Sequence, residues 1–315
     1  APLHYRRHND WPPFSFRWNP PVCGTKVRMK RLCLATVTTD NYLVGTLVTL
    51  HSFFATNPWF DGDVVLITEG LNASSRAHIE AIVPQVRYHA PSADLNARLD
   101  TLYASDPEMV RKRPRFHAIE AFRLEGYERV LFIDSDLLFR GSIEGLLSHE
   151  GQLVACGDGA YYKGKRRSWM PDTQTISTFN SGVISIAGSL IGEGHYLGLL
   201  DLIEGGDPEV PIMHLTDQLV LNIYFAGRAS LAGPEFNYLF VHEQAIRATT
   251  GVSPAQARVL HFNGRHKPWD GNQVLLNGVR QPAFTRACIQ WYEALEACLA
   301  NLHLQKIGTT SGPAD

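Results

Sequence analysis

Apolar runs alternate with amphipathic stretches through the first half of the chain. Four runs rich in Val, Ile and Leu predict strands: Arg31–Thr38, Asp63–Thr68, Val86–His89 and Arg129–Ile133. Helical spacing of apolar residues between them predicts helices over 42–55, 74–83 and 114–126. Strands that alternate with helices are typical of a mostly parallel sheet covered by helices on both faces. The predicted fold class is therefore α/β.

The second half of the chain is less regular. It predicts strands at Gly182–Ala187 and Arg258–Phe262, a helix at Thr216–Phe225 and an amphipathic helix from Pro282 to about Leu302. The last helix carries a stripe that predicts core packing: Trp291, Leu295, Cys298 and Leu302. We therefore predict an irregular N-terminal arm at 1–29, one catalytic domain at 30–280, a C-terminal helix at 281–304 packed on it, and a disordered tail at 305–315.

Two carboxylates, Asp134 and Asp136, interrupt the apolar run VLFIDSDLLF at the end of a predicted strand. An ionised Asp is costly to bury unless it is paired, hydrogen-bonded or bound to a metal. Ligands of parallel sheets bind beyond the carboxyl ends of the strands, where Thr38 and Thr39 are also expected. Carboxylates at this position suit Mg²⁺ or Mn²⁺, although cap and turn residues give the same pattern.

Three later motifs favour the metal interpretation. Phe179–Gly182 (FNSG) places an amide and a hydroxyl beside a strand, and Asp217-Gln218 begins an apolar helix. The run HFNGRHKPW brings His261 to a strand end and follows it with Lys267. Alone, His261 is typical of a core histidine and Lys267 of a surface charge. Together with the paired carboxylates they suit a metal held by two Asp and one His, with a diphosphate beside it.

These motifs, in this order, resemble those of glycosyltransferase family 8, and most of all its glycogenin-type branch, from about Leu32 to Trp269. The resemblance implies a GT-A fold, in which a mostly parallel, Rossmann-like sheet is flanked by helices in a single catalytic domain. It also implies Mn²⁺ (or Mg²⁺) as cofactor, a UDP-sugar as donor substrate and retention of anomeric configuration. The hydroxyl acceptor would be a carbohydrate, a lipid-linked molecule or a protein.

The resemblance also implies three groups of residue roles. The metal ligands would be Asp134, Asp136 and His261. The nucleotide, donor sugar and diphosphate would be bordered by Val37, Thr38, Tyr42, Ser135, Asn180, Ser181, Gly264 and Lys267. The catalytic residues beside the sugar would be Asp217, Gln218 and Arg115. The segment near Tyr42 is one residue shorter than in glycogenin. We expect Asp217 to orient the sugar during front-face attack, and a covalent role as nucleophile stays open.

Composition narrows the remaining classes of protein. The formal net charge of -2 gives no case for a nucleic-acid partner. Five scattered cysteines without a C-x-x-C pair indicate reduced thiols. No apolar run is long enough to span a bilayer, and no signal peptide is visible. We predict a cytoplasmic protein; a lumenal or secreted location, prior removal of an N-terminal segment, and a homodimer all stay open.

The motifs fit two other classes of enzyme poorly. A phosphatase of the haloacid-dehalogenase type needs D-x-D on its first strand, and a sugar-nucleotide pyrophosphorylase normally has a Gly-rich loop near its start; neither feature is present. A sugar-nucleotide-binding protein without activity, and a glycogenin-like self-glycosylating primer, stay as alternatives. The segment Gly157–Thr178, with Tyr161, Tyr162 and Trp169, predicts a mobile loop on the acceptor side.

Overall fold

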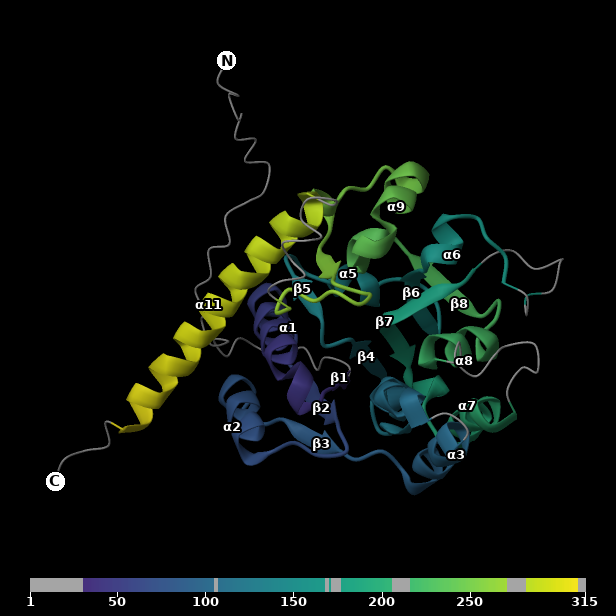
Figure 1. Ribbon diagram of the computed structural model, residues 1–315, viewed down its shortest axis with the longest axis horizontal. Helices are drawn as coiled ribbons and strands as arrows, with labels where there is room; N and C mark the ends of the chain where they lie inside the picture. The colour runs from purple at the N-terminus through teal and green to yellow at the C-terminus, as the bar shows by residue number, and fades with distance from the viewer. Residues whose placement is uncertain are drawn as a thin grey trace, which may run out of the picture.

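The computed structural model describes residues 31–104, 107–167, 170, 177–205, 216–270 and 282–310. The predicted N-terminal arm at 1–29 lies outside these residues. The described residues form one α/β unit around a central sheet, as Figure 1 shows. The predicted fold class and single domain are confirmed.

Four parallel strands form the first half of the central sheet. They are β1 (Leu32–Val37), β2 (Asp63–Ile67), β3 (Arg87–His89) and β4 (Arg129–Ile133). All four lie where the apolar runs predicted them. Since β1 pairs with β4 in parallel, the segments that follow these two strands meet at one edge of the sheet.

Three further strands complete this seven-stranded sheet, whose order is β3-β2-β1-β4-β7-β6-β8. They are β6 (Leu153–Gly157), β7 (Phe179–Ala187) and β8 (Ala229–Ala232). Strand β7 runs antiparallel to both β4 and β6. It begins at Phe179, three residues before the predicted Gly182, so the FNSG motif is part of the strand. Strands β6 and β8 were not predicted.

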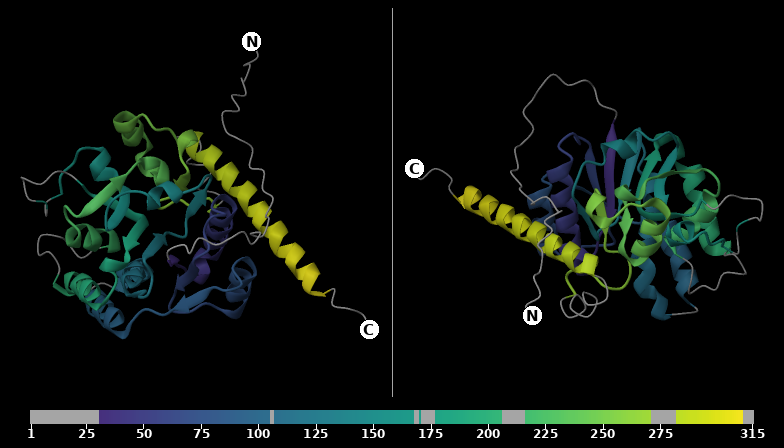
Figure 2. Two further views of the ribbon diagram at one scale, coloured as in Figure 1. Left: turned by 180° about the vertical axis from the view of Figure 1, so that it is seen from behind. Right: turned by 90° about the horizontal axis from the view of Figure 1, so that it is seen from above.

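Helices cover both faces of the central sheet (Figure 1, Figure 2). Strand β1 shows why, since Leu34 packs with the helices of one face while Cys33 and Ala35 pack with those of the other. The first face carries α1 (Leu43–Thr56), α2 (Ala73–Ile82) and α5 (Glu144–Leu147). The second carries α3 (Ala93–Ala104), α7 (Glu193–Gly205) and α8 (Asp217–Tyr224).

The helix predicted from residue 114 to 126 is only partly α-helical. A short α4 (Arg113–Phe116) passes into the 3-10 helix η3 (His117–Arg123). The buried residues Phe116, Ile119 and Phe122 are spaced by three, which is the repeat of a 3-10 helix. This spacing puts all three side chains on one line against the sheet.

A second, small sheet lies beside the first and has the order β5-β10-β9. Its strands are β5 (Leu137–Phe139), β9 (Tyr238–Leu239) and β10 (Val259–His261). It packs against α9 (Glu243–Thr250) and α11 (Pro282–Thr310). A short helix, α6 (Gly159–Tyr162), follows β6.

Helix α11 runs along the side of the domain next to α1, and its C-terminal part projects beyond the body (Figure 1, Figure 2). The predicted packing stripe is confirmed, because Trp291, Cys298 and Leu302 are buried and Leu295 packs beside them. The helix continues to Thr310, past the predicted end at residue 304, so the predicted tail begins within it.

Four cysteines of the described segments are buried free thiols: Cys33, Cys156, Cys288 and Cys298. Burial raises the pKa of the Cys33 thiol to about 12. The fifth, Cys23, lies outside the described residues. Among the helices that the structure describes, none combines the length and apolar character needed to cross a membrane.

Candidate metal and nucleotide-sugar site

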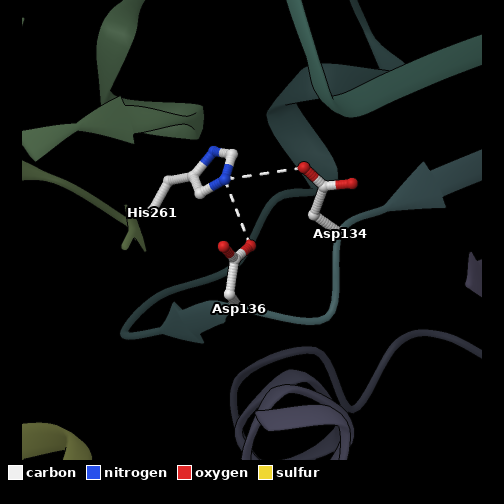
Figure 3. Close-up of side chains that lie close together, drawn as sticks. All are labelled: Asp134, Asp136 and His261. Atoms are coloured by element: carbon white, nitrogen blue, oxygen red, sulfur yellow. Dashed lines mark ion pairs between the residues drawn. The ribbon is translucent and has the colours of Figure 1, made fainter. Parts of the chain in front are cut away.

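Asp134, Asp136 and His261 converge at the edge of the central sheet, as Figure 3 shows. Asp134 follows β4, Asp136 precedes β5, and His261 ends β10 in the small sheet. His261 Nε2 lies 3.2 Å from Asp136 Oδ1 and 3.5 Å from Asp134 Oδ2. One ligand atom of each residue lies within 4.8 Å of the others, so the three could hold one metal ion.

Strand pairing brings these distant residues together. His261 of β10 pairs with Leu137 of β5, the residue after Asp136. The Phe262 N–H donates to the Asp136 carbonyl at 3.1 Å. On the other side, the Asp134 N–H donates to the Gly182 carbonyl of β7 at 2.8 Å. The ligand geometry is therefore fixed by backbone hydrogen bonds from two sheets.

Gly182 leaves the space in which the ligand side chains meet. A Cβ at this position would lie 2.4 Å from His261 Cε1 and 2.7 Å from Asp134 Oδ2. The second residue of the FNSG motif, Asn180, also accepts a hydrogen bond from the Gly182 N–H at 3.0 Å. Two carboxylates and an imidazole around such a cradle suit Mn²⁺ or Mg²⁺ with further ligands from a substrate.

Lys267 lies inside this site and not at the surface. Its ammonium donates to Asp136 Oδ2 and, at 2.9 Å, to the carbonyl of Phe262. Asp136 therefore uses Oδ2 for Lys267 and turns Oδ1 toward His261. The contact between Lys267 and a diphosphate stays a prediction.

The two carboxylates have opposite shifts in pKa. Partial burial, together with the charge of Asp136, raises the pKa of Asp134 to about 7. The pKa of Asp136 is held well below its usual range, since the charge of Lys267 outweighs the cost of burial. The pKa of Lys267 is raised because the Asp136 carboxylate outweighs the burial of its ammonium. Asp136 therefore holds its negative charge more strongly than Asp134 does.

Asp217 is the first residue of α8 and is buried. The Ser181 hydroxyl donates to its Oδ2 at 2.8 Å. Burial raises the pKa of Asp217, and the hydrogen bond from Ser181 and the charge of Arg115 oppose that rise. The negative charge of Asp217 also raises the pKa of Asp134, so the two carboxyl groups are close enough to interact. Helix α8 is capped by Thr216, whose hydroxyl accepts from the Leu219 N–H.

The residues predicted to border the nucleotide surround the start of α1. Val37 is half-buried and Thr38 is buried directly after β1, where the Thr38 hydroxyl bonds to Thr46 at 2.7 Å. Tyr42 is partly exposed and meets Trp269 edge to face at 5.7 Å. Asp40 lies in a 3-10 turn before α1, and Tyr42, at the start of that helix, makes no side-chain capping hydrogen bond.

Two glycines allow close approach around this side of the site. A Cβ on Gly45 would lie 2.5 Å from the Ser135 carbonyl and 2.6 Å from the indole of Trp269. Gly264 has a φ of +96°, which favours glycine. Gly264 is exposed, and Ser135 is half-buried.

A chain of hydrogen-bonded amides that leads to His261 was missed by the sequence predictions. Asn180 and Gln218 were predicted to contact the donor sugar, and they hydrogen-bond to each other at 2.8 Å. Asn237, directly before β9, links Asn180 to His261. Asp158 lies at the far end beside Gln218. The signal for Asn237 was present, because it is a single amide inside the apolar run FNYLFV.

The predicted acceptor-side loop is only partly described. Tyr162 is buried in the cluster that contains Ile246 and Tyr238, so it packs in the core instead of offering a face to a sugar. Tyr161 is half-buried, and Arg167 pairs with Asp158 at 3.2 Å. Trp169 lies outside the described residues.

Comparison with known proteins gives concordant sequence matches. The model of glycosyl transferase family 8 matches residues 33–273, well over half of the chain. The lipopolysaccharide 1,3-galactosyltransferase of Salmonella typhimurium is 25% identical over 255 residues, which cover 73% of this chain and 70% of that protein. Glycosyltransferase GlyF of Streptococcus pneumoniae is 24% identical over 185 residues, 57% of this chain and 42% of that protein.

The fold agrees with these matches. A crystal structure of the galactosyltransferase LgtC with donor and acceptor sugar analogues aligns with a TM-score of 0.65 at 19% identity, over 84% of this chain and 95% of that one. This likeness confirms the predicted GT-A fold. Membership of the glycogenin-like branch stays a prediction.

Proposed function

Because the chain belongs to glycosyltransferase family 8 and is a glycosyltransferase, we propose that it is a retaining, metal-dependent enzyme that transfers a hexose from a UDP-sugar to a hydroxyl acceptor. The observation that carries this proposal is the convergence of Asp134, Asp136 and His261, with Lys267 fixed against them. A hard divalent cation needs oxygen and imidazole donors, and a departing diphosphate needs positive charge.

The three ligand residues would hold Mn²⁺ or Mg²⁺. Such an ion, when bound, supplies Lewis-acid neutralisation of the charge that develops on a leaving diphosphate. We propose that Lys267 adds a fixed ammonium at the same position and that Gly264 lets the backbone approach the phosphates. Val37, Thr38, Tyr42 and Ser135 would border the nucleoside.

Asp217 is suited to orient the sugar and to stabilise positive charge on its ring. It is buried, its position is fixed by the hydrogen bond from Ser181, and it lies within the electrostatic reach of Arg115. In the proposed step the C1–O bond breaks and its electron pair leaves with UDP. The acceptor oxygen bonds C1 from the same face, and its proton passes to the departing phosphate oxygen. Asn180 and Gln218 would line the sugar beside Asp217.

The role of Asp217 has its own test. Incubation of the protein with a UDP-sugar and Mn²⁺, followed by intact-protein mass spectrometry, is expected to show no mass increase of one hexose at Asp217. A trapped sugar–Asp217 adduct, located by peptide mapping, would replace front-face attack with a covalent intermediate.

The donor and acceptor are proposed at the level of chemical class. The names of the Salmonella relative and of LgtC make UDP-galactose the first donor to test, and UDP-glucose, UDP-xylose and UDP-N-acetylglucosamine follow. The acceptor would be a carbohydrate, a lipid-linked molecule or a protein. We propose a cytoplasmic location, which the buried free thiols support.

A hydrolysis screen tests the proposed function. UDP-sugars and GDP-sugars are incubated with the protein and Mn²⁺, and nucleotide diphosphate release is measured with and without a chelator. The expected result is release from one or more UDP-hexoses that is lost on chelation. Nucleotide diphosphate release that is unchanged by the chelator would contradict metal dependence. Absence of release from every sugar nucleotide would contradict the transferase proposal.

A further inference from the structure

A row of hydrogen-bonded side chains leads from His261 away from the metal position. His261 Nδ1 bonds to Asn237 Oδ1 at 2.8 Å, and Asn237 Nδ2 donates to Asn180 Oδ1 at 2.8 Å. Asn180 Nδ2 donates to Gln218 Oε1 at 2.8 Å, and Gln218 Nε2 donates to Asp158 Oδ2 at 3.4 Å. Asn237 is fully buried, and His261 is 2% exposed.

A group that can only donate fixes which atoms donate and which accept along this row. The backbone N–H of Gly182 can only donate, and it donates to Asn180 Oδ1 at 3.0 Å. Since that oxygen accepts, the group that Asn237 presents to it must be the amide NH₂. The oxygen of Asn237 is then the atom that faces His261, and the imidazole must donate to it from Nδ1.

The far end of the row agrees with this assignment. Asn180 turns its NH₂ toward Gln218, so the Gln218 oxygen accepts and its own NH₂ faces Asp158. An ionised Asp158 is an acceptor only, and its Oδ1 already accepts from Thr178 and from the backbone of α6. A donor-only group and an acceptor-only group therefore impose the same direction on the row.

We propose that Asn237 is a positioning residue that holds the neutral His261 imidazole with its proton on Nδ1, so that the Nε2 lone pair points at the metal position. The inference rests on the proposed metal-dependent function. Asn237 lies outside the motifs that carry the family resemblance. It links the proposed metal ligand His261 to Asn180 and Gln218 on the sugar side. Partners of this kind orient ligand histidines and increase their basicity.

The alternative tautomer shows what Asn237 prevents. Asp136 Oδ1 lies 3.2 Å from Nε2 and would accept a proton held there. Without the acceptor at Nδ1, the neutral ring is free to place its proton on Nε2. That proton would block the lone pair that a metal needs, and Nδ1 would be left facing a site with no donor.

Substitution of Asn237 separates this role from simple packing. Asn237→Leu removes the acceptor at similar volume, whereas Asn237→Asp keeps an oxygen toward Nδ1. We expect Mn²⁺ affinity, measured by isothermal titration, to fall about 10- to 100-fold in Asn237→Leu. It should fall clearly less in Asn237→Asp, which loses the donor to Asn180 but keeps the acceptor for Nδ1. Asn57→Leu is the matched control, because Asn57 is another fully buried amide with bonds to Phe53 and Ile143.

The second measurement is the tautomer itself. Nitrogen-15 NMR of His261 in the parent protein with Mg²⁺ is expected to show a proton on Nδ1 and none on Nε2. A parent ring without the Nδ1 proton would overturn the inference, even if Asn237→Leu fails to fold. A folded Asn237→Leu protein with the parent's Mn²⁺ affinity would overturn it as well. A parent that binds neither ion would contradict the proposed metal role instead, and the Nδ1 proton would then be read without metal.

Discussion

Lys267 donates from its ammonium to Oδ2 of Asp136, although 131 positions separate the two residues in the sequence. Their side chains are 10% and 8% exposed, so the ion pair is largely removed from water. Oδ1 of the same carboxylate faces His261. One buried carboxylate is therefore shared between a fixed cation and the proposed metal, and the two cations compete for its charge.

Lys267→Met is expected to destabilise the protein by about 3–5 kcal/mol without metal, because it leaves the Asp136 charge buried and unpaired. The same variant should bind Mn²⁺ more tightly and UDP more weakly than the parent. Thermal unfolding with and without Mn²⁺ checks this, since the ion should raise the melting temperature of Lys267→Met more than that of Lys267→Arg. Equal increases in the two variants would contradict the shared-carboxylate account.

Asp134→Asn is expected to leave the fold intact and to lower Mn²⁺-dependent UDP release by at least about 100-fold. The change removes one ligand oxygen, and it also removes the repulsion between the two carboxylates. Circular dichroism and UDP-release kinetics check both parts. Asp136→Asn is a poorer choice, because it takes the counter-charge from Lys267. Retained metal-dependent turnover in Asp134→Asn would exclude Asp134 as a ligand.

The raised pKa of Asp134, about 7, predicts how stability changes with pH in the absence of metal. The folded protein holds this proton more tightly than the unfolded chain, where an Asp has a pKa of about 3.9. The contribution of Asp134 to stability is therefore complete below about pH 4 and is lost as the pH rises through about 7. Asp136, His261, Asp217 and Lys267 also act on this carboxyl.

Comparison with Asp134→Asn isolates this effect. The melting temperature of the variant minus that of the parent should increase between about pH 5 and pH 8 and then level off. Both proteins are measured in chelator. A difference that stays constant across this range would show that the Asp134 carboxyl is ionised throughout.

Gly182→Ala tests the cradle without changing any charge. Its Cβ would come within 2.4 Å of His261 Cε1, so the imidazole must move away from the carboxylates. Mn²⁺ affinity is expected to fall about tenfold or more by isothermal titration. Gly194→Ala in α7 is the control, because its Cβ would meet nothing within 4 Å and alanine favours a helix. Unchanged Mn²⁺ affinity in folded Gly182→Ala would show that the site accommodates a Cβ at position 182 without displacing His261.

Several elements could be predicted because their signal is local. Strand β4 has the predicted bounds Arg129–Ile133, since a strand buried on both faces is a continuous apolar run that can be recognised from its own residues. Strand β6 (Leu153–Gly157) and helix α7 (Glu193–Gly205) were missed. The first is a short run that ends in Gly, and glycines interrupt the periodicity of the second.

The three candidate metal ligands, Asp134, Asp136 and His261, were predicted from motif order, but the way they come together was not. Nothing local to His261 shows that β10 pairs with β5 and carries the imidazole past Asp136. Lys267 was assigned to a phosphate, and its pairing with Asp136 depends on a turn that only the fold specifies. Asn237 was missed for the same reason, because its partners come from β7 and β10.

Isothermal titration of the parent protein with Mn²⁺, followed by UDP, tests the central claim most directly. The account predicts that one Mn²⁺ binds, that UDP binds more tightly once the ion is present, and that Asp134→Asn loses both effects. UDP binding of equal strength in chelator and in Mn²⁺, or no binding of either ligand, would contradict the proposal that Asp134, Asp136 and His261 form the metal site of a nucleotide-sugar transferase.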